Sequence, residues 1–207
     1  MAGGYWEAAG ARKVFRHPVP LQAIAARLAP AARILDFGCG YGRAMRDLAR
    51  AGFRNTVGTD PSAALIARGR RESPGLRMEH APHLPLEYPD GAFDAVLLIS
   101  VLAVVPDDGE QRRIAAEVER LCAPGGPVFL GDYPLQGSEH YRALYAASRH
   151  PVRGVFTNPD GAVFRHHDPA HVAALFPHCE IADARETESA SLGGRPMRAL
   201  QWVLRRT

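Results

Sequence analysis

Short apolar runs alternate with amphipathic stretches along the first two thirds of the chain. These patterns predict strands at 32–37, 53–60, 76–80, 93–100 and 128–133, and the continuous apolar run at 93–100 predicts a fully buried one. The stretches between them predict helices at 20–29, 41–51, 62–71 and 108–122. In the last of these, Ile114, Val118 and Leu121 recur at helical spacing on one face. This order predicts an α/β fold with a mostly parallel sheet.

After residue 133 the alternation is less regular. The stretch 141–147 predicts a helix, and VFTNPDGAVF, at 155–164, predicts a hairpin. Asp168 and Pro169 supply an N-cap and a first-turn proline for another helix. Two final strands are expected near 178–187 and 197–205. We find no repeat or linker, so we expect one domain over 1–207.

Composition narrows the class of protein. The 207 residues are 46% hydrophobic and 23% charged, as in an ordinary globular domain that buries a sizeable core. No apolar run has the roughly 20 residues of a membrane helix, and the first residues lack the apolar centre of a signal peptide. We therefore expect a cytoplasmic protein with no membrane partner.

Cysteine and charge patterns exclude further classes. Cys39, Cys122 and Cys179 lie far apart without CxxC spacing, which indicates reduced thiols and no structural metal. The net charge of +3 comes without any block of five or six like charges. We therefore expect no nucleic-acid partner.

The sequence ILDFGCGYGR carries the main chemical signal. Gly38, Gly40 and Gly42 follow a predicted strand and precede a helix, and such a bare turn lets free backbone amides approach a ligand. Asp60 ends the next strand, where its carboxylate can accept hydrogen bonds from both ribose hydroxyls. Together these features indicate a nucleotide-like cofactor.

Spacing and charge favour one cofactor over another. A dinucleotide fingerprint requires glycine or alanine at position 43, where this chain has Arg43. The Asp36 carboxylate would repel a pyrophosphate but suits the cationic amino end of a methionyl group. The pattern therefore favours S-adenosylmethionine over NAD.

Four motifs in order now support a resemblance: ILDFGCGYG, VGTDPS, HLPLEYPDGAFDAVLLIS and VERLCAPGGPVFLGDY. Over roughly 34–133 the chain resembles the class I S-adenosylmethionine-dependent methyltransferases, particularly small bacterial ones acting on metabolites. The resemblance implies a Rossmann-like three-layer α/β/α sandwich, with a mostly parallel seven-stranded sheet and an antiparallel C-terminal strand. It also implies an N-terminal helical lid over 1–30 and a substrate-side insertion over 134–176.

By resemblance, the three glycines line the methionyl end, Asp60 the ribose, and His80 with Ala81 the adenine. His80 stands where the family commonly has an acidic residue, and a neutral histidine can accept one hydrogen bond or stack on the base. The full expected cofactor set is Asp36, Gly38, Cys39, Gly40, Gly42, Asp60, Pro61, Ser62, His80, Ala81, Ser100 and Val101.

The implied reaction is an in-line displacement, in which the protein aligns the acceptor with the S–CH3 bond and excludes water. His166 and His167 are candidate bases for an acceptor that must lose a proton, and two solvent-exposed loop histidines are the alternative. The expected substrate-side residues are Tyr5, Trp6, His17, Tyr133, Tyr141 and Arg165. Ordinary core aromatics and a surface ion pair are the alternatives for these residues.

The sequence thus predicts methyl transfer to a small molecule, at oxygen or nitrogen and with carbon as a further option, giving S-adenosylhomocysteine. No metal is expected, because the strand ending in LLISVL offers no carboxylate beside Asp132. The alternatives are an RNA or protein methyltransferase, a non-catalytic cofactor-binding protein and, disfavoured by Arg43, an NAD-linked reductase. We expect a monomer or homodimer.

Overall fold

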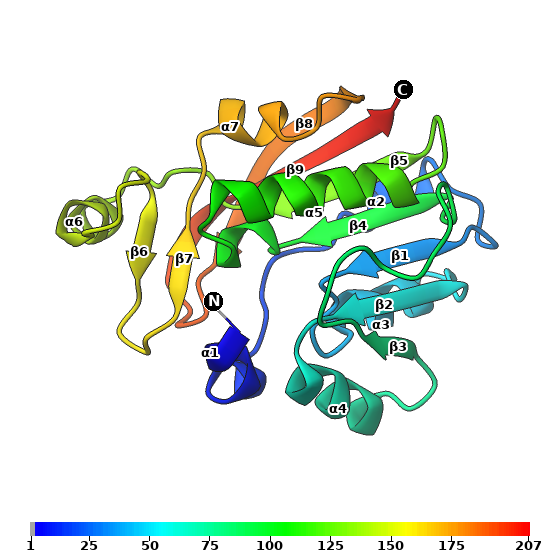
Figure 1. Cartoon of the computed structure of the whole chain (residues 1–207), viewed down its shortest axis with the longest axis horizontal. Coiled ribbons are helices and arrows are strands. Elements are labelled where there is room, and N and C mark those ends of the chain that lie inside the picture. Colours follow the sequence, from blue (N-terminus) through cyan, green and yellow to red (C-terminus); the bar gives the residue numbers. More distant parts are fainter. Residues whose placement is uncertain (1–2) are drawn as a thin grey trace.

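The apolar runs form a twisted sheet in the computed structural model, which describes residues 3–207 (Figure 1). Its strands are β1 (Ile34–Phe37), β2 (Thr56–Asp60), β3 (Arg77–His80), β4 (Ala95–Ile99), β5 (Pro127–Asp132), β8 (Cys179–Ala190) and β9 (Pro196–Arg206). Their order is β3-β2-β1-β4-β5-β9-β8, in which β1 to β5 pair in parallel and β9 runs antiparallel to both neighbours. The predicted fold class is confirmed.

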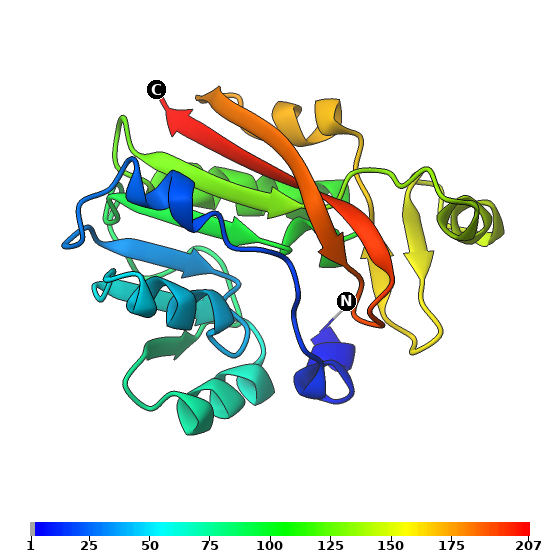
Figure 2. The ribbon, with the colours of Figure 1, turned by 180° about the vertical axis from the view of Figure 1, so that it is seen from behind.

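Helices cover both faces of the sheet. They are α1 (Gly3–Glu7), α2 (Leu21–Ala25), α3 (Arg43–Arg50), α4 (Ala63–Glu72), α5 (Asp108–Leu121), α6 (Glu139–Ala147) and α7 (Pro169–Ala174), with short 3-10 turns η1 (Gly10–Arg12) and η2 (Leu102–Val104). Helices α5 and α7 lie on the face seen in Figure 1, and α2 and α3 lie on the face seen in Figure 2.

Successive strand residues point to opposite faces, and this alternation supplies two apolar cores. Leu35 packs in the core under α5 and α7, together with Val118 and Val172. Its neighbour Ile34 packs in the other core, with Leu48 of α3. The central strands are buried on both faces, as the continuous apolar run predicted for β4.

Local signals fixed several helix ends. The Ser62 side chain accepts from the Leu65 N–H at the start of α4, and Asp168, as predicted, accepts from the Ala170 N–H at the start of α7. The expected helix at 20–29 is shorter, since α2 ends at Ala25 and Ala26 caps it. Helix α1 lies within the expected N-terminal helical segment, although no bounds were predicted for it.

The segments outside the sheet gather at one end of it. Strands β6 (Val155–Thr157) and β7 (Val163–Arg165) form the predicted hairpin, which lies with α6 beyond the carboxyl ends of β4 and β5 (Figure 1). Helix α1 lies near the carboxyl end of β1. Residues 1–2 of the expected N-terminal lid lie outside the described residues. Among residues 3–207, no helix is long and apolar enough to cross a membrane.

Candidate active site

A cavity of about 1190 Å³ opens over the carboxyl ends of β1, β2 and β4. The N-terminal segment, η2, the end of β5 and the α6 and hairpin region close it from the other sides. In an open α/β sheet this edge is where ligands bind, because the strand order reverses there. The cavity is therefore the candidate active site.

The glycine turn after β1 adopts the conformation that its sequence predicted. Gly38, Gly40 and Gly42 have φ of +73°, +57° and +77°, a region that other residues rarely adopt. A Cβ at Gly38 would lie 2.5 Å from Val101, and one at Gly40 would lie 2.4 Å from the Phe15 ring. Gly38 lines the cavity, whereas Phe15 covers Gly40 and Met78 packs on Gly42.

Asp60 links this turn to the following helix. Its Oδ2 accepts from the Gly40 N–H and its Oδ1 from the Ser62 N–H, both at 2.8 Å. Burial raises the pKa of Asp60 to about 6, although these two hydrogen bonds favour the ionised form. Each carboxylate oxygen retains acceptor capacity, and the residue lines the cavity together with Pro61 and Ser62. The position suits two ligand hydroxyls.

Asp36, on β1, is the least satisfied acidic group of the cavity. The side chain is 2% exposed, and its Oδ2 has no hydrogen-bond partner among the described residues. Burial raises the pKa of Asp36 to about 7, and the Arg43 guanidinium opposes part of that rise. A buried carboxylate without a partner is costly, and a cationic ligand group would relieve that cost.

Arg43 lies beside it, at the first residue of α3. Its guanidinium donates to the carbonyl of His17 at 2.5 Å, its Nε is buried without a partner in the described chain, and it lines the cavity. From the sequence alone, Arg43 is evidence only against a dinucleotide cofactor. Its place at a helix N-terminus, directly after the glycines, was the signal for an anion-binding group.

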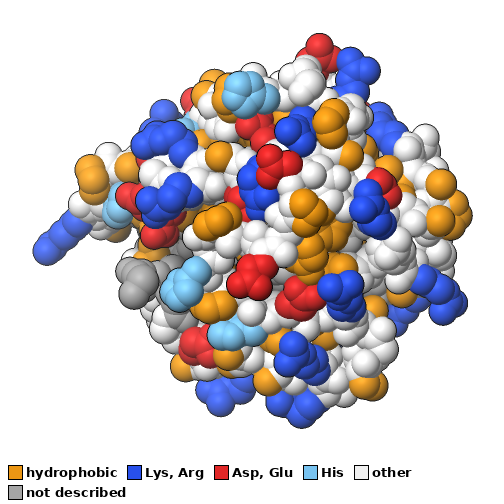
Figure 3. Space-filling view, turned by 45° about the vertical axis from the view of Figure 1, so that its right-hand side comes forward, with side chains coloured by type: hydrophobic (Ala, Val, Ile, Leu, Met, Phe, Trp, Pro, Cys, Tyr) orange, Lys and Arg blue, Asp and Glu red, His pale blue; other side chains and the backbone are white. Residues whose placement is uncertain are grey.

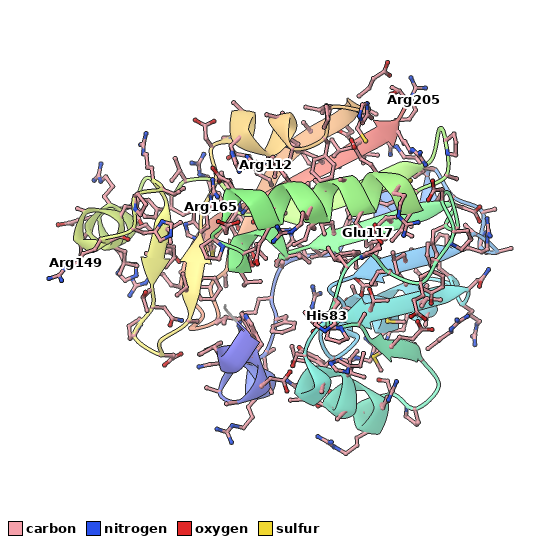
Figure 4. All side chains as sticks on the ribbon, in the orientation of Figure 1. His83, Arg112, Glu117, Arg149, Arg165 and Arg205 are labelled. Atoms are coloured by element: carbon pink, nitrogen blue, oxygen red, sulfur yellow. The ribbon has the colours of Figure 1, made fainter. Side chains whose placement is uncertain are left out.

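The loop after β3 forms the part of the cavity wall that follows Asp60 and Ser62. Ala81, Pro82, His83 and Leu84 line the cavity there. Figure 4 shows His83 beside the opening. His80 is exposed, its Nε2 lies 3.1 Å from the Pro61 carbonyl, and it is not among the lining residues.

Ser100, directly after β4, carries backbone strain at the centre of the site. Its φ of +59° is the one positive value outside glycine in the described chain. Its Oγ is buried without a partner in residues 3–207 and belongs to the cavity wall, as does Val101. Such strain tends to occur at ligand sites, where the surrounding fold holds it in place.

The other half of the cavity is aromatic. Its walls include Trp6, Phe15, Tyr133, Tyr141, Phe156 and Phe164. Trp6 makes edge contacts with Phe15 and Phe164, at 5.9 and 6.4 Å between ring centres. Tyr5 packs against Trp6 behind this wall and does not line the cavity.

The N-terminal segment is held across the cavity by polar contacts. The Trp6 carbonyl accepts from Ser62 Oγ, and a Glu7 carboxylate oxygen accepts from the Ala64 N–H of α4. Farther along, Lys13 pairs with Asp160 on the hairpin loop at 2.5 Å. These contacts join the two halves of the site.

Of the two candidate bases, one faces the cavity. His166 is 3% exposed and lines the aromatic half, and its Nδ1 lies 2.6 Å from the Tyr145 hydroxyl. His167 points away from the cavity and lies 3.6 Å from Asp132. Burial lowers the pKa of both histidines to about 3. The alternative of two solvent-exposed histidines is wrong.

Two other expected substrate residues lie elsewhere. His17 is buried against Tyr133 and Gly131, outside the cavity lining, where burial lowers its pKa to about 3. Arg165 donates to Asp108 at 2.5 Å and to the Pro106 carbonyl at 3.0 Å. Figure 4 shows it between β7 and the start of α5, where it joins the hairpin to the main sheet region.

No group of three or more His, Cys, Asp or Glu side chains that would suit a metal is found within residues 3–207. The cavity offers the carboxylates of Asp36 and Asp60, the guanidinium of Arg43, a glycine turn and an aromatic chamber. These parts suit a zwitterionic nucleoside beside a flat acceptor.

Comparisons with known proteins agree with this geometry. Residues 35–130 match the family model described as a methyltransferase domain. The ubiquinone biosynthesis O-methyltransferase of Xanthomonas axonopodis pv. citri (strain 306) is 36% identical over an alignment of 138 residues that covers 63% of this chain and 56% of that protein. The corresponding enzyme of Xanthomonas campestris pv. campestris (strain B100) matches equally. The chain thus spans a little over half the length of these relatives.

Solved structures share the fold. A methyltransferase of Methanosarcina mazei described as SAM-dependent superposes with a TM-score of 0.80 at 23% identity, over 92% of this chain and 98% of that one. The 1,6-didemethyltoxoflavin-N1-methyltransferase of Burkholderia thailandensis gives 0.62 at 20% identity, over 97% and 79%. The matched family region contains the glycine turn, Asp60 and β4, which form the cofactor side of the cavity. Over residues 35–130 the chain thus matches the methyltransferase-domain family, and its fold is that of S-adenosylmethionine-dependent methyltransferases.

Proposed function

We propose that this protein transfers the methyl group of S-adenosylmethionine to a small aromatic molecule. The observation that carries the proposal is the continuity of one cavity from the buried Asp36 carboxylate to the aromatic chamber around His166. A cofactor held at the first end directs its methyl group toward an acceptor held at the second. Bound S-adenosylmethionine supplies a methyl group already activated by the sulfonium charge.

The cofactor side has a partner for each charged or polar part of that molecule. Asp36 pairs with the ammonium group and Arg43 with the carboxylate, so two unpartnered buried atoms of the protein are satisfied together. Asp60 accepts from the ribose hydroxyls. The adenine lies against the loop 81–84 and Val101. His80 ends the strand before that loop and contributes only by positioning the loop backbone. The product is S-adenosylhomocysteine.

The acceptor side favours a flat, largely apolar molecule. Trp6, Phe15, Tyr133 and Phe164 provide ring faces and edges, which bind aromatic ligands better than flexible ones. The relatives named for ubiquinone biosynthesis methylate oxygen, and we extend that chemistry to this chain, with nitrogen as the second choice. The protein contributes alignment and exclusion of water, because the displacement requires no covalent enzyme intermediate.

An RNA or protein acceptor is less favoured. The surface in Figure 3 intersperses basic and acidic side chains and shows no broad basic groove on that face. Nucleic-acid binding depends on a concentrated positive surface. We also propose a cytoplasmic location, no membrane partner and a monomer or homodimer, as the composition suggests.

The test is transfer of tritium from methyl-labelled S-adenosylmethionine into a cell extract that is then separated into metabolites, RNA and protein. Asp36→Asn is the loss variant, since Asp60→Ala would also release the N–H groups of Gly40 and Ser62. Asp90→Asn, on an exposed loop, is the matched control.

We expect label in metabolites, retained in the control and lost in Asp36→Asn. Label in RNA or protein would show that the acceptor is a macromolecule and not a small molecule. Cofactor binding without label in any fraction would support a non-catalytic protein, and absence of calorimetric binding would refute the proposal altogether.

A further inference from the structure

The Tyr145 hydroxyl is the only polar group of the described chain that reaches the His166 ring. It lies 2.6 Å from Nδ1, shorter than the roughly 2.9 Å typical of N–H donors and nearer the spacing of O–H donors. The rest of the ring is surrounded by aromatic side chains, with Phe156 at 4.9 Å and Tyr141 at 5.0 Å between ring centres. The tautomer of the imidazole therefore depends on whether this hydroxyl donates or accepts a hydrogen bond.

The hydroxyl oxygen already accepts one hydrogen bond. The backbone N–H of Gln136 donates to it at 3.0 Å. Gln136 is itself held firmly, because its side chain donates to the carbonyls of Pro134 and Arg198 and accepts from the Arg198 N–H. The position of the Tyr145 oxygen is thus set by rigid backbone.

Among the described residues, the hydroxyl proton has one acceptor within reach, which is His166 Nδ1. If Nδ1 carried the imidazole proton, the tyrosine oxygen would accept twice and its own proton would have no partner among the described residues. A hydrogen-bond donor that is turned away from water and left without an acceptor is unfavourable. The arrangement with Tyr145 as donor avoids this cost and leaves the proton of the neutral imidazole on Nε2.

We infer that Tyr145 holds His166 in the tautomer with its proton on Nε2, so that His166 meets the methyl acceptor as a hydrogen-bond donor and not as a base. His166 Nε2 has no partner within residues 3–207, and the ring lines the aromatic chamber. Tyr145 is a positioning residue in this arrangement. The inference rests on the proposed function only for the identity of the ligand that Nε2 meets.

This assignment narrows the acceptor. The N–H at Nε2 can donate a hydrogen bond to an oxygen of the acceptor. That oxygen can be an anion, because the neutral ring carries no negative charge to repel it. An acceptor hydroxyl therefore gives its proton to solvent and is bound as the oxyanion. Its lone pair forms the new O–CH3 bond as the C–S bond breaks toward sulfur, so an anion and a sulfonium become two neutral products. Acidic phenols and enols fit this site better than alkyl alcohols.

The test is a long-range proton–nitrogen NMR spectrum of the full chain labelled with nitrogen-15 in histidine. His166→Gln identifies the His166 signals among those of the nine histidines. We expect a protonated Nε2 and a bare, hydrogen-bonded Nδ1 at neutral pH. A protonated Nδ1 with a bare Nε2, or a doubly protonated ring, would overturn the inference.

Two variants test the role of the hydroxyl. Tyr145→Phe is expected to move the Nδ1 resonance to that of an unbonded ring nitrogen. Tyr141→Phe is the matched control, since this ring also packs on His166 while its hydroxyl lies 3.8 Å from the Met197 sulfur. An unmoved Nδ1 resonance in Tyr145→Phe would contradict the assignment. The wild-type spectrum decides the tautomer without either variant or methyl transfer, so failure of the proposed function would be recognised separately.

Discussion

Replacing Asp36 by asparagine should stabilise the protein without cofactor while weakening cofactor binding. Asp36 is buried, one of its oxygens has no partner among the described residues, and its pKa is raised to about 7. The unfolded chain ionises this carboxyl near its ordinary value of 3.8. Between these two values, the folded state retains a proton that the unfolded state has released, so stability falls as pH rises.

The size of the effect follows from the same two values. A rise in the pKa from 3.8 to about 7 corresponds to about 4 kcal/mol of lost stability once both states are ionised. At about pH 5.5 only about 2 kcal/mol of this has been lost. Asparagine has a similar shape and no charge. The stability advantage of Asp36→Asn should therefore grow by about 2 kcal/mol between about pH 5.5 and pH 8.5.

Urea denaturation of the wild type and of Asp36→Asn at several pH values measures the difference in their free energies of unfolding. The contributions of other titrating groups largely cancel in this difference. Asp90→Asn, in an exposed pair with Arg120, is the matched control and should show a difference that does not grow. Calorimetry should show S-adenosylmethionine binding weakened roughly ten- to hundred-fold in Asp36→Asn, the loss expected for one charge-assisted bond. A stability difference independent of pH would refute the reasoning.

Two further substitutions test the neighbouring parts of the site. Arg43→Gln should weaken binding of S-adenosylmethionine roughly ten- to hundred-fold but leave binding of its decarboxylated analogue unchanged, with Arg46→Gln as the control on the same helix. Equal losses for both ligands in calorimetry would remove Arg43 from the carboxylate site. Gly40→Ala should lower the free energy of unfolding by about 1–3 kcal/mol, and should also speed proteolysis of the N-terminal segment, because its Cβ would lie 2.4 Å from Phe15. Gly52→Ala, at a φ of +95° with open space around it, should lower stability but leave proteolysis unchanged, and equal proteolysis of the two variants would contradict the contact.

The cofactor half of the fold was predictable because its signals are local. Strands β1 and β4 are short, mostly apolar runs that are buried along their whole length, and Ser62 and Asp168 cap helices with their own side chains. The glycine turn requires positive φ at three positions, and glycine supplies this conformation wherever it occurs. No contact between distant segments is needed to read these features.

The acceptor half was predicted less well because its geometry depends on such contacts. His166 and His167 are adjacent in an extended stretch, so their side chains point in opposite directions, and only packing decides which one meets the cavity. Arg165 is drawn to Asp108, more than fifty residues away in the sequence. The roles of Tyr145 and Phe15 likewise depend on partners that no local pattern reveals.

Three poorly satisfied groups of the cavity indicate where the sequence serves a ligand more than the fold. Asp36 and Arg43 carry buried atoms without partners in the described chain, and Ser100 adds an unfavourable backbone angle with an unpartnered hydroxyl. Each feature lowers stability by itself, and all three line one cavity. The zwitterionic end of the ligand would pair with both Asp36 and Arg43. Ligand binding should therefore raise the free energy of unfolding.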